Sequence, residues 1–209
     1  MALNDDLKKA LNELRKNDKR KFDQTVDLII NLQKFDFKKN PLNLVLNVPH
    51  KVKDKKIGAF LESKIPHVET ISANEFKKYN NKSALKRLVK KFDFFIAQAS
   101  LMPKVASTFG RVLGPVGKMP SPQMGIIMNA DEKIIKDLKN KIGNSVKFRV
   151  KESSIKLAIG KESMKDEDII ENITTVYNAL VKALPRDKDN IKNIKIKFTM
   201  TKPQKISIR

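Results

Sequence analysis

The stretch from residue 101 to residue 125 gathers residue types that suit the binding of an anion. It holds four of the chain's seven glycines and four of its nine prolines, but no aspartate or glutamate. Its cations are Lys104, Arg111 and Lys118. Glycine permits positive φ and close backbone approach, whereas proline fixes φ and removes a hydrogen-bond donor. We therefore predict a loop of defined shape that binds an anionic partner; the alternative is a structural loop packed on its own domain.

Two known phosphate-binding loops can be compared with this stretch. A Walker-type loop needs glycine five residues before the glycine of a Gly-Lys-Ser/Thr ending. Gly117-Lys118 has Val112 at that position and is followed by Met119, so both the glycine and the magnesium-binding hydroxyl are missing. The Gly-x-Gly-x-x-Gly spacing of dinucleotide-binding folds is absent as well. The sequence therefore disfavours a nucleotide cofactor.

Residues that could perform catalysis or bind a metal are scarce. The two histidines, His50 and His67, lie 17 residues apart and near no obvious nucleophile. We expect His50, after Pro49, to shape a hinge, and His67 to lie in a loop. The acidic run 166–168 is typical of a helix start. Because the chain has no cysteine, disulfides and thiolate metal sites are excluded, and we predict neither an enzyme nor a metal or cofactor site.

The charge balance points to a polyanionic partner. Forty-four Lys and Arg against 23 Asp and Glu give a formal net charge of +21, which self-repels unless a polyanion neutralises it. A membrane is a poor candidate, because no apolar run approaches the roughly 18 residues of a spanning segment. The net charge is +5 in residues 1–53, +9 in 54–146 and +7 in 147–209. This spread favours contact through folded surfaces over contact through one basic tail.

The two ends of the chain share one pattern. Apolar alternation typical of half-buried strands covers residues 26–32, 42–48, 148–150, 155–159 and 194–200, and helical spacing covers residues 3–14 and 166–184. The alternation predicts that Ile194, Ile196, Phe198 and Met200 point one way in the last strand. Strands and helices of this kind predict an α+β domain built from both ends.

The middle of the chain has a different pattern. Short apolar runs at 57–61, 68–71 and 92–97 are separated by helical spacing, and a further helix is predicted near 131–139. Strands buried on both faces and separated by helices are typical of a parallel sheet. We therefore predict that residues 54–146 form an α/β domain, inserted into the α+β domain of residues 1–53 and 147–209.

Several motifs resemble a known family. The run from Phe109 to Ser121, FGRVLGPVGKMPS, resembles the signature of the ribosomal protein L-one family, and FDQTV at 22–26, GKES at 160–163 and Thr199-Met200 extend the likeness along nearly the whole chain. The resemblance is to the archaeal type. It implies a discontinuous α+β domain that binds RNA, with an inserted Rossmann-like α/β domain.

The resemblance also implies a function. The protein would be a non-catalytic, cytoplasmic constituent of the large ribosomal subunit, monomeric when free. It would bind a structured region of large-subunit ribosomal RNA and form the mobile stalk beside the exit site, assisting release of deacylated tRNA. Its own messenger RNA would be a second target, through which it represses translation. Two alternatives remain open: a nonspecific DNA-compacting protein, and an enzyme that binds a nucleotide in its α/β domain.

The last strand offers the clearest candidate surface. Residues 192–209 carry six cations and no acid. By alternation Lys195, Lys197, Thr199 and Thr201 share a face, where lysines can meet phosphates and hydroxyls can bond ribose 2′-OH groups. The alternative is an ordinary solvated strand face. Alternation puts Met200 on the apolar face, where a core role competes with RNA contact.

The resemblance adds RNA-contacting positions near the first strand and near residue 160. Phe22 could equally be the first core residue of that strand, and Thr201 stands where the family usually has glycine. With no Trp and two Tyr, the chain has few stacking platforms for single strands, so structured RNA is favoured. The predicted RNA-binding residues are Lys21, Phe22, Thr25, Lys156, Lys161, Ser163, Lys195, Lys197, Thr199, Met200 and Thr201.

Overall fold

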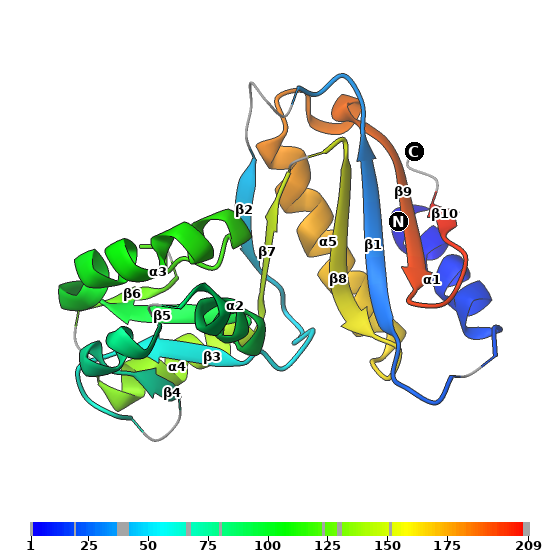
Figure 1. Cartoon of the computed structure of the whole chain (residues 1–209). Coiled ribbons are helices and arrows are strands. Elements are labelled where there is room, and N and C mark those ends of the chain that lie inside the picture. Colours follow the sequence, from blue (N-terminus) through cyan, green and yellow to red (C-terminus); the bar gives the residue numbers. More distant parts are fainter. Residues whose placement is uncertain are drawn as a thin grey trace. The chain divides into compact units, whose positions relative to one another are not determined.

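A computed structural model of the chain describes residues 2–18, 20–36, 42–65, 68–79, 81–122, 124–128, 131–150 and 152–206. The chain divides into two compact units (Figure 1). The first unit comprises residues 1–53 and 144–209, and the second comprises residues 54–143. His67, expected in a loop, lies outside the described residues. The second boundary falls three residues before the predicted one, because Ser145 and Val146 already belong to a strand of the first unit.

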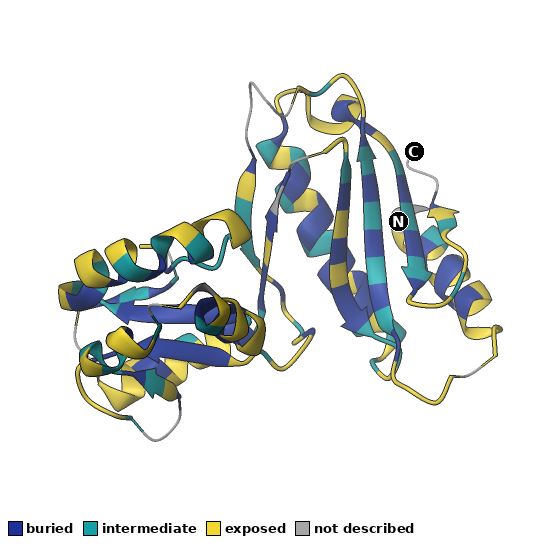
Figure 2. Cartoon of the chain, viewed as in Figure 1, coloured by how far each residue is buried: buried dark blue, intermediate teal, exposed yellow. Residues whose placement is uncertain are grey.

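The first unit is built on an antiparallel sheet in the order β10-β9-β1-β8. Its strands are β1 (Thr25–Leu32), β8 (Ser154–Lys161), β9 (Ile191–Phe198) and β10 (Gln204–Ile206). Along β1, half-buried and buried residues alternate, as the banding in Figure 2 shows. A separate antiparallel pair joins β2 (Asn43–Asn47) to β7 (Ser145–Arg149).

Helices pack on one face of the four-stranded sheet. The helix α1 (Ala2–Arg15) packs against β9 and β10, and α5 (Asp166–Ala183) packs against β8 (Figure 1). The short η3 (Asp187–Asn190) leads into β9. Leu11, Leu28, Ile173 and Ile196 belong to the one apolar core that these elements share. No described helix packs on the opposite face of the sheet.

His50 is anchored to α5. Its backbone N–H donates to Asn172 Oδ1 at 3.0 Å, and Asn172 Nδ2 donates to the carbonyl oxygens of His50 and Ile159 at 3.0 Å each. The His50 ring lies 2.7 Å from Glu171 Oε2. Because Asn172 is fully buried, its amide fixes the chain on α5 just before the first segment of this unit ends at Lys53.

The second unit is a parallel sheet covered on both faces. The strand order is β4-β3-β5-β6, with β3 (Ile57–Phe60), β4 (Glu69–Ile71), β5 (Phe94–Gln98) and β6 (Ile126–Ile127). On one face pack η1 (Ala73–Tyr79), α2 (Lys82–Lys91), η2 (Ala99–Leu101) and α3 (Met102–Val116); on the other packs α4 (Glu132–Gly143). The predicted α+β and α/β fold class is confirmed.

The predicted loop over residues 101–125 is wrong for most of its length, because α3 occupies 102–116. Val105, Phe109 and Leu113 follow one another at intervals of four and are fully buried, which places a continuous apolar stripe on the sheet. Pro103 lies in the first helical turn, where its missing N–H is harmless. The helix ends at Gly117, whose φ of 74° is left-handed, so only residues 117–125 form a loop before β6.

Candidate nucleic-acid interface

Three segments far apart in sequence meet at one end of the first unit's sheet. β1 is flanked by β8 and β9, both antiparallel to it, so the start of β1 lies beside the ends of its neighbours. Thr25 pairs with Lys161 on one side, and Val26 pairs with Phe198 on the other. The segment before β1, the turn after β8 and the turn after β9 therefore form one cluster, here called the sheet-end cluster (residues 21–25, 161–163 and 199–201).

A single buried glutamine joins the three parts of the sheet-end cluster. Gln24 is 2% exposed. Its Oε1 accepts from the backbone N–H of Met200 at 3.1 Å, and its Nε2 donates to Glu162 Oε2 at 3.1 Å. Its carbonyl oxygen accepts from the Glu162 N–H at 2.8 Å. Because the amide of Gln24 is bonded at both ends, the two turns are held in fixed positions relative to the start of β1.

Asp23 organises the turn after β8. Its carboxylate accepts from the Ser163 N–H and Oγ at 3.1 Å each, and Lys161 Nζ lies 3.2 Å from Oδ2. Partial desolvation acts to raise the pKa of Asp23, but the hydrogen bonds from Lys161 and Ser163, with the charge of Lys161, bring the pKa below its ordinary value. The predicted residues Lys161 and Ser163 are thus held by one carboxylate, with the remaining ammonium donors of Lys161 available to a ligand.

The two threonines after β9 lie in a turn and not on the strand face, so that part of the prediction is wrong. β9 ends at Phe198. Thr199 Oγ1 accepts from the Thr25 N–H at 3.0 Å and donates to the Thr25 carbonyl oxygen at 3.4 Å. Thr201 Oγ1 accepts from the Phe198 N–H at 2.9 Å. The Thr199 hydroxyl therefore bonds to β1, and the Thr201 hydroxyl closes the turn after β9; alternation extended from the strand cannot predict either contact.

Two large apolar side chains project from the sheet-end cluster. Met200 is 60% exposed and Phe22 is 51% exposed. The predictions that Met200 faces the apolar side and that Phe22 could be a core residue are both wrong, since neither contributes to the buried core. Lys21 beside Phe22 is also exposed. Exposed apolar side chains next to cations are suited to packing on unstacked bases and riboses.

The remaining predicted residues lie on the open face of the same sheet. The register places Ile29 of β1 between Lys156 of β8 and Lys195 of β9, with Lys205 of β10 beside Lys195. Since neighbouring strands are about 4.8 Å apart, these three lysines form a row across four strands. Sequence reasoning missed Lys205, although it belongs to the same acid-free stretch as Lys195.

One carboxylate interrupts the positive charge of the open face. Asp27 pairs with Lys197 of β9 and with Ala158 of β8. Burial raises the pKa of Asp27, and the opposing charge of Lys197 offsets part of this effect. The face therefore carries Lys156, Lys195, Lys197 and Lys205 around a carboxylate that is partly desolvated.

Asp23 and Gln24 are residues of the sheet-end cluster that the sequence analysis did not single out. Gln24 is buried and Asp23 is exposed, and the hydrogen bonds of both hold the neighbouring turns in place. Both residues belong to the FDQTV motif at 22–26, in which two polar residues directly precede a strongly alternating strand. Such a pair marks a structured strand entry, but it does not reveal which turns it holds.

The second unit does not present the predicted anion-binding loop. The ammonium of Lys118 donates to the carbonyl oxygens of Val89 and Phe92 at 2.8 and 2.7 Å. These carbonyls lie at the C-terminal end of α2, where a cation complements the helix dipole. Lys118 is therefore a structural cap, and the expectation that it binds an external anion is wrong.

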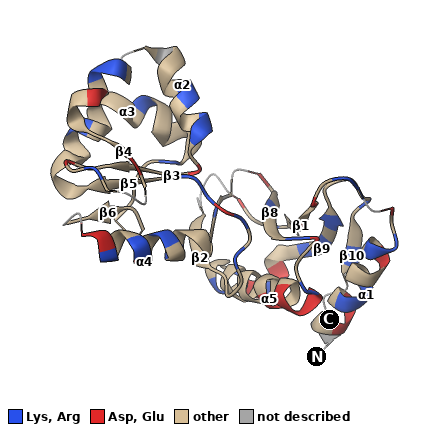
Figure 3. Cartoon of the chain, turned by 90° about the horizontal axis from the view of Figure 1, so that it is seen from below, with Lys and Arg blue, Asp and Glu red and all other residues tan. Residues whose placement is uncertain are grey.

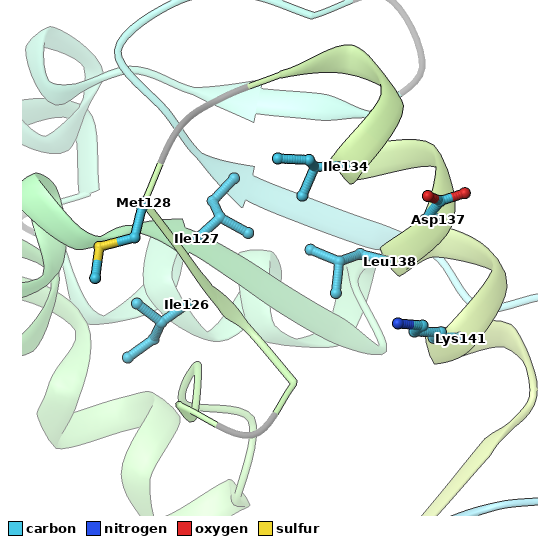
Figure 4. Close-up of a pocket in the computed structure, with 7 residues that line it drawn as sticks. All are labelled: Ile126, Ile127, Met128, Ile134, Asp137, Leu138 and Lys141. Carbon is cyan, nitrogen blue, oxygen red and sulfur yellow. The ribbon is translucent and has the colours of Figure 1, made fainter.

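The second unit also contains an apolar hollow of about 430 Å³ beside β6 and α4 (Figure 4). Its apolar lining is Ile126, Ile127, Met128, Ile134 and Leu138, and its polar lining is Asp137 and Lys141. It lacks a convergent set of polar groups of the kind that orients a small ligand. Among the described residues, no group of three or more His, Asp or Glu side chains could hold a metal ion. No described helix is both long enough and apolar enough to span a bilayer.

Comparisons with known proteins identify the family of the chain. The family model "Ribosomal protein L1p/L10e family" matches residues 14–202. "Large ribosomal subunit protein uL1" of Nanoarchaeum equitans is 36% identical, over 94% of this chain and 95% of that protein. The proteins of the same name from Thermoplasma acidophilum and Pyrococcus abyssi are 36% and 33% identical, over 93% and 87% of this chain and 93% and 85% of theirs. The predicted resemblance is confirmed: the chain belongs to the ribosomal protein L1p/L10e family.

Proposed function

We propose that this protein is a structural constituent of the large ribosomal subunit in the cytoplasm, and that its first unit binds a structured region of large-subunit ribosomal RNA. Family membership supports the ribosomal role. The observation that carries the RNA-binding proposal is the sheet-end cluster, in which buried Gln24 holds two turns that expose Met200 and Phe22. No catalytic step is part of this proposal.

The proposed interface divides into two kinds of contact. Lys156, Lys195 and Lys197 on the open face and Lys161 at its end would contact phosphates, which supplies affinity that falls with salt. Phe22 and Met200 would pack against unstacked nucleotides, which supplies discrimination between RNA shapes. Because a fixed turn presents Met200, little conformational entropy is lost when it binds.

Finer functions extend the proposal. The stalk role beside the exit site would follow if the first unit stays on ribosomal RNA while the second unit remains free to approach deacylated tRNA. Two compact units joined by two chain crossings support such an arrangement. Repression through the protein's own messenger RNA would use the sheet-end cluster again, and requires only that the message fold into a similar shape.

The proposal is tested by truncating the exposed apolar side chains. Replacing Phe22 with alanine should weaken binding to a large-subunit ribosomal RNA fragment by about 1–3 kcal/mol, the usual effect of losing one base–aromatic stacking contact. Replacing Met200 with alanine should also weaken this binding, because an apolar contact is lost. Met128→Ala is the matched control, because Met128 is an 82%-exposed methionine of the second unit. Affinities that are unchanged in Phe22→Ala and Met200→Ala, measured by filter binding, would contradict the proposed site.

A further inference from the structure

The second unit carries an unbroken run of positive charge that the proposed interface does not use. Residues 77–91 contain seven Lys and Arg and no Asp or Glu. Five of these cations lie within the ten residues of α2, as Figure 3 shows in blue. The acid-free stretch at the C-terminus of the chain belongs to the first unit, so this is a separate concentration of charge on a separate unit.

The helix period gathers the cations of α2 on one side. Leu85, Leu88 and Val89 are buried against the sheet. Successive residues turn by about 100° around a helix, so Lys86, Arg87 and Lys90 fall within an arc of about 100° on the opposite side. All three are exposed, and none makes an ion pair or side-chain hydrogen bond with another described residue. We call Lys86, Arg87 and Lys90 the α2 basic face.

This arrangement is unfavourable for the isolated helix. Like charges four residues apart repel, as in Lys86 with Lys90 and Arg87 with Lys91, and only Lys91 has an acidic partner, Glu69. No acidic residue lies in the first turn of α2 to complement the helix dipole. Apolar packing and the Asn81 cap hold the helix in spite of this repulsion. A bound polyanion would relieve the repulsion.

We propose that the α2 basic face binds the sugar–phosphate backbone of double-stranded RNA, as a second contact independent of the sheet-end cluster. Protein interfaces are depleted in lysine and enriched in aromatic residues, which makes an acidic protein a poorer match. Single-stranded nucleic acid requires aromatic stacking platforms. Near α2 the aromatic side chains are not exposed platforms: Phe92 is buried, and Tyr79 is half-buried in a shallow hollow with Arg87 and Lys91.

The test compares two triple variants of the full chain that lose the same charge. The first is Lys86→Gln, Arg87→Gln and Lys90→Gln. The control is Lys133→Gln, Lys136→Gln and Lys141→Gln, on α4, which packs on the other face of the same sheet. Affinity for a short random-sequence RNA duplex is measured as a function of salt. Circular dichroism and thermal unfolding establish that both variants are folded.

The α2 variant should bind the duplex on the order of ten-fold more weakly at low salt. The slope of log affinity against log salt should be smaller in magnitude by about 2–3, which corresponds to three lost phosphate contacts. The α4 variant should retain the parent slope. Equal effects of the two variants would overturn the proposal, because net charge alone would then explain them. If polyglutamate at equal charge concentration displaces the duplex, the RNA proposal is overturned and an acidic protein is the better partner.

This outcome is separable from the proposed ribosomal RNA site. Met200→Ala should reduce preference for the ribosomal fragment over the random duplex, whereas the α2 variant should reduce affinity for both RNAs and leave that preference intact. Loss of preference in the α2 variant would contradict an independent second contact.

Discussion

At the scale of single residues, the hydroxyl of Thr199 stabilises the protein's own backbone and is also a candidate RNA contact. It accepts from the Thr25 N–H and donates to the Thr25 carbonyl oxygen, which continues the β1–β9 pairing beyond the last strand residue. A hydroxyl offers one donor and two acceptor sites, so one acceptor site of Thr199 stays open to RNA. Substitutions at Thr199 therefore change folding and binding together.

We predict that Thr199→Val lowers the free energy of unfolding by about 1 kcal/mol, because the half-buried Thr25 N–H loses its acceptor. Thr199→Ser keeps the hydroxyl and is the control, with stability close to the parent. Urea unfolding measures both. Equal stabilities of the valine and serine variants would show that this hydroxyl does not support the sheet end.

Asp27 and Asp23 are predicted to affect stability with opposite signs. Burial raises the pKa of Asp27, so its charged form destabilises the folded state, and Asp27→Asn should raise stability at pH 7. The pKa of Asp23 is lowered, so its contribution is present above the ordinary carboxyl pKa and disappears as pH falls through the folded value. Asp23→Asn should therefore lower stability at pH 7.

Both differences from the parent should shrink as the pH falls, because each parent carboxyl becomes neutral like the asparagine. Asp27, whose pKa is raised above 3.8, is neutralised first, and Asp23, whose pKa is lowered, is neutralised last. Thermal unfolding between pH 3 and pH 7 measures this. Asp27→Asn should also bind RNA more tightly, since it removes the carboxylate of the open face. A destabilised Asp27→Asn would mean that the pairing with Lys197 outweighs the desolvation of the carboxylate.

At the scale of elements, α3 shows how glycine and proline can be accommodated in a helix. The Lys118 N–H donates to the Leu113 carbonyl at 3.0 Å and the Gly117 N–H to the Gly114 carbonyl at 2.9 Å, which closes the last turn. The left-handed φ of Gly117 makes this geometry possible. Gly110, in contrast, lies in mid-helix, and a Cβ added there would meet nothing within 4 Å.

These two glycines make a matched pair. Gly117→Ala should lower the free energy of unfolding by about 1–2 kcal/mol, because a Cβ strains the left-handed conformation. Gly110→Ala should raise it by about 0.5–1 kcal/mol, because alanine favours the helix and meets open space. Chemical unfolding distinguishes the two, and changes of the same sign would contradict the end of α3 at Gly117.

The elements that sequence could predict are those with a long, consistent period. β1 and α5 each repeat one apolar spacing over their whole length, and β3 and β5 are continuous buried runs. In α3 the same signal exists in Val105, Phe109 and Leu113, but the helix also contains four glycines and prolines, which point to a loop: Pro103, Gly110, Gly114 and Pro115. Burial of this apolar stripe against the sheet stabilises the helix by more than the low helix propensity of glycine and proline destabilises it. The local sequence cannot reveal this, because the stabilisation depends on the sheet.

The candidate site was predictable in its residues but not in its geometry. Family motifs point to residues at both ends of the chain, and the antiparallel order of β8, β1 and β9 brings them together. Alternation fails at Phe198, because a turn closed by Thr201 begins there and reverses the side on which Met200 projects. The role of Gln24 depends on two long-range contacts, which no local pattern encodes.

At the scale of the whole molecule, each unit has its own apolar core and its own surplus of positive charge. With a net charge of +21, any polyanion will bind at low salt, so affinity alone says little about function. What distinguishes a ribosomal RNA-binding protein from a nonspecific compacting protein is the affinity that persists when salt screens the phosphates. In our account that affinity comes from the sheet-end cluster.

The most direct measurement is a competition assay on the full chain, at about 200 mM salt, between a labelled large-subunit ribosomal RNA fragment and unlabelled random duplex DNA. A binder that uses six to ten phosphate contacts alone loses roughly 10³–10⁵ in affinity between 50 and 200 mM salt. We predict that the ribosomal fragment stays bound in excess duplex, and that Phe22→Ala with Met200→Ala removes this preference. Equal competition by random duplex DNA at that salt would contradict specific RNA recognition.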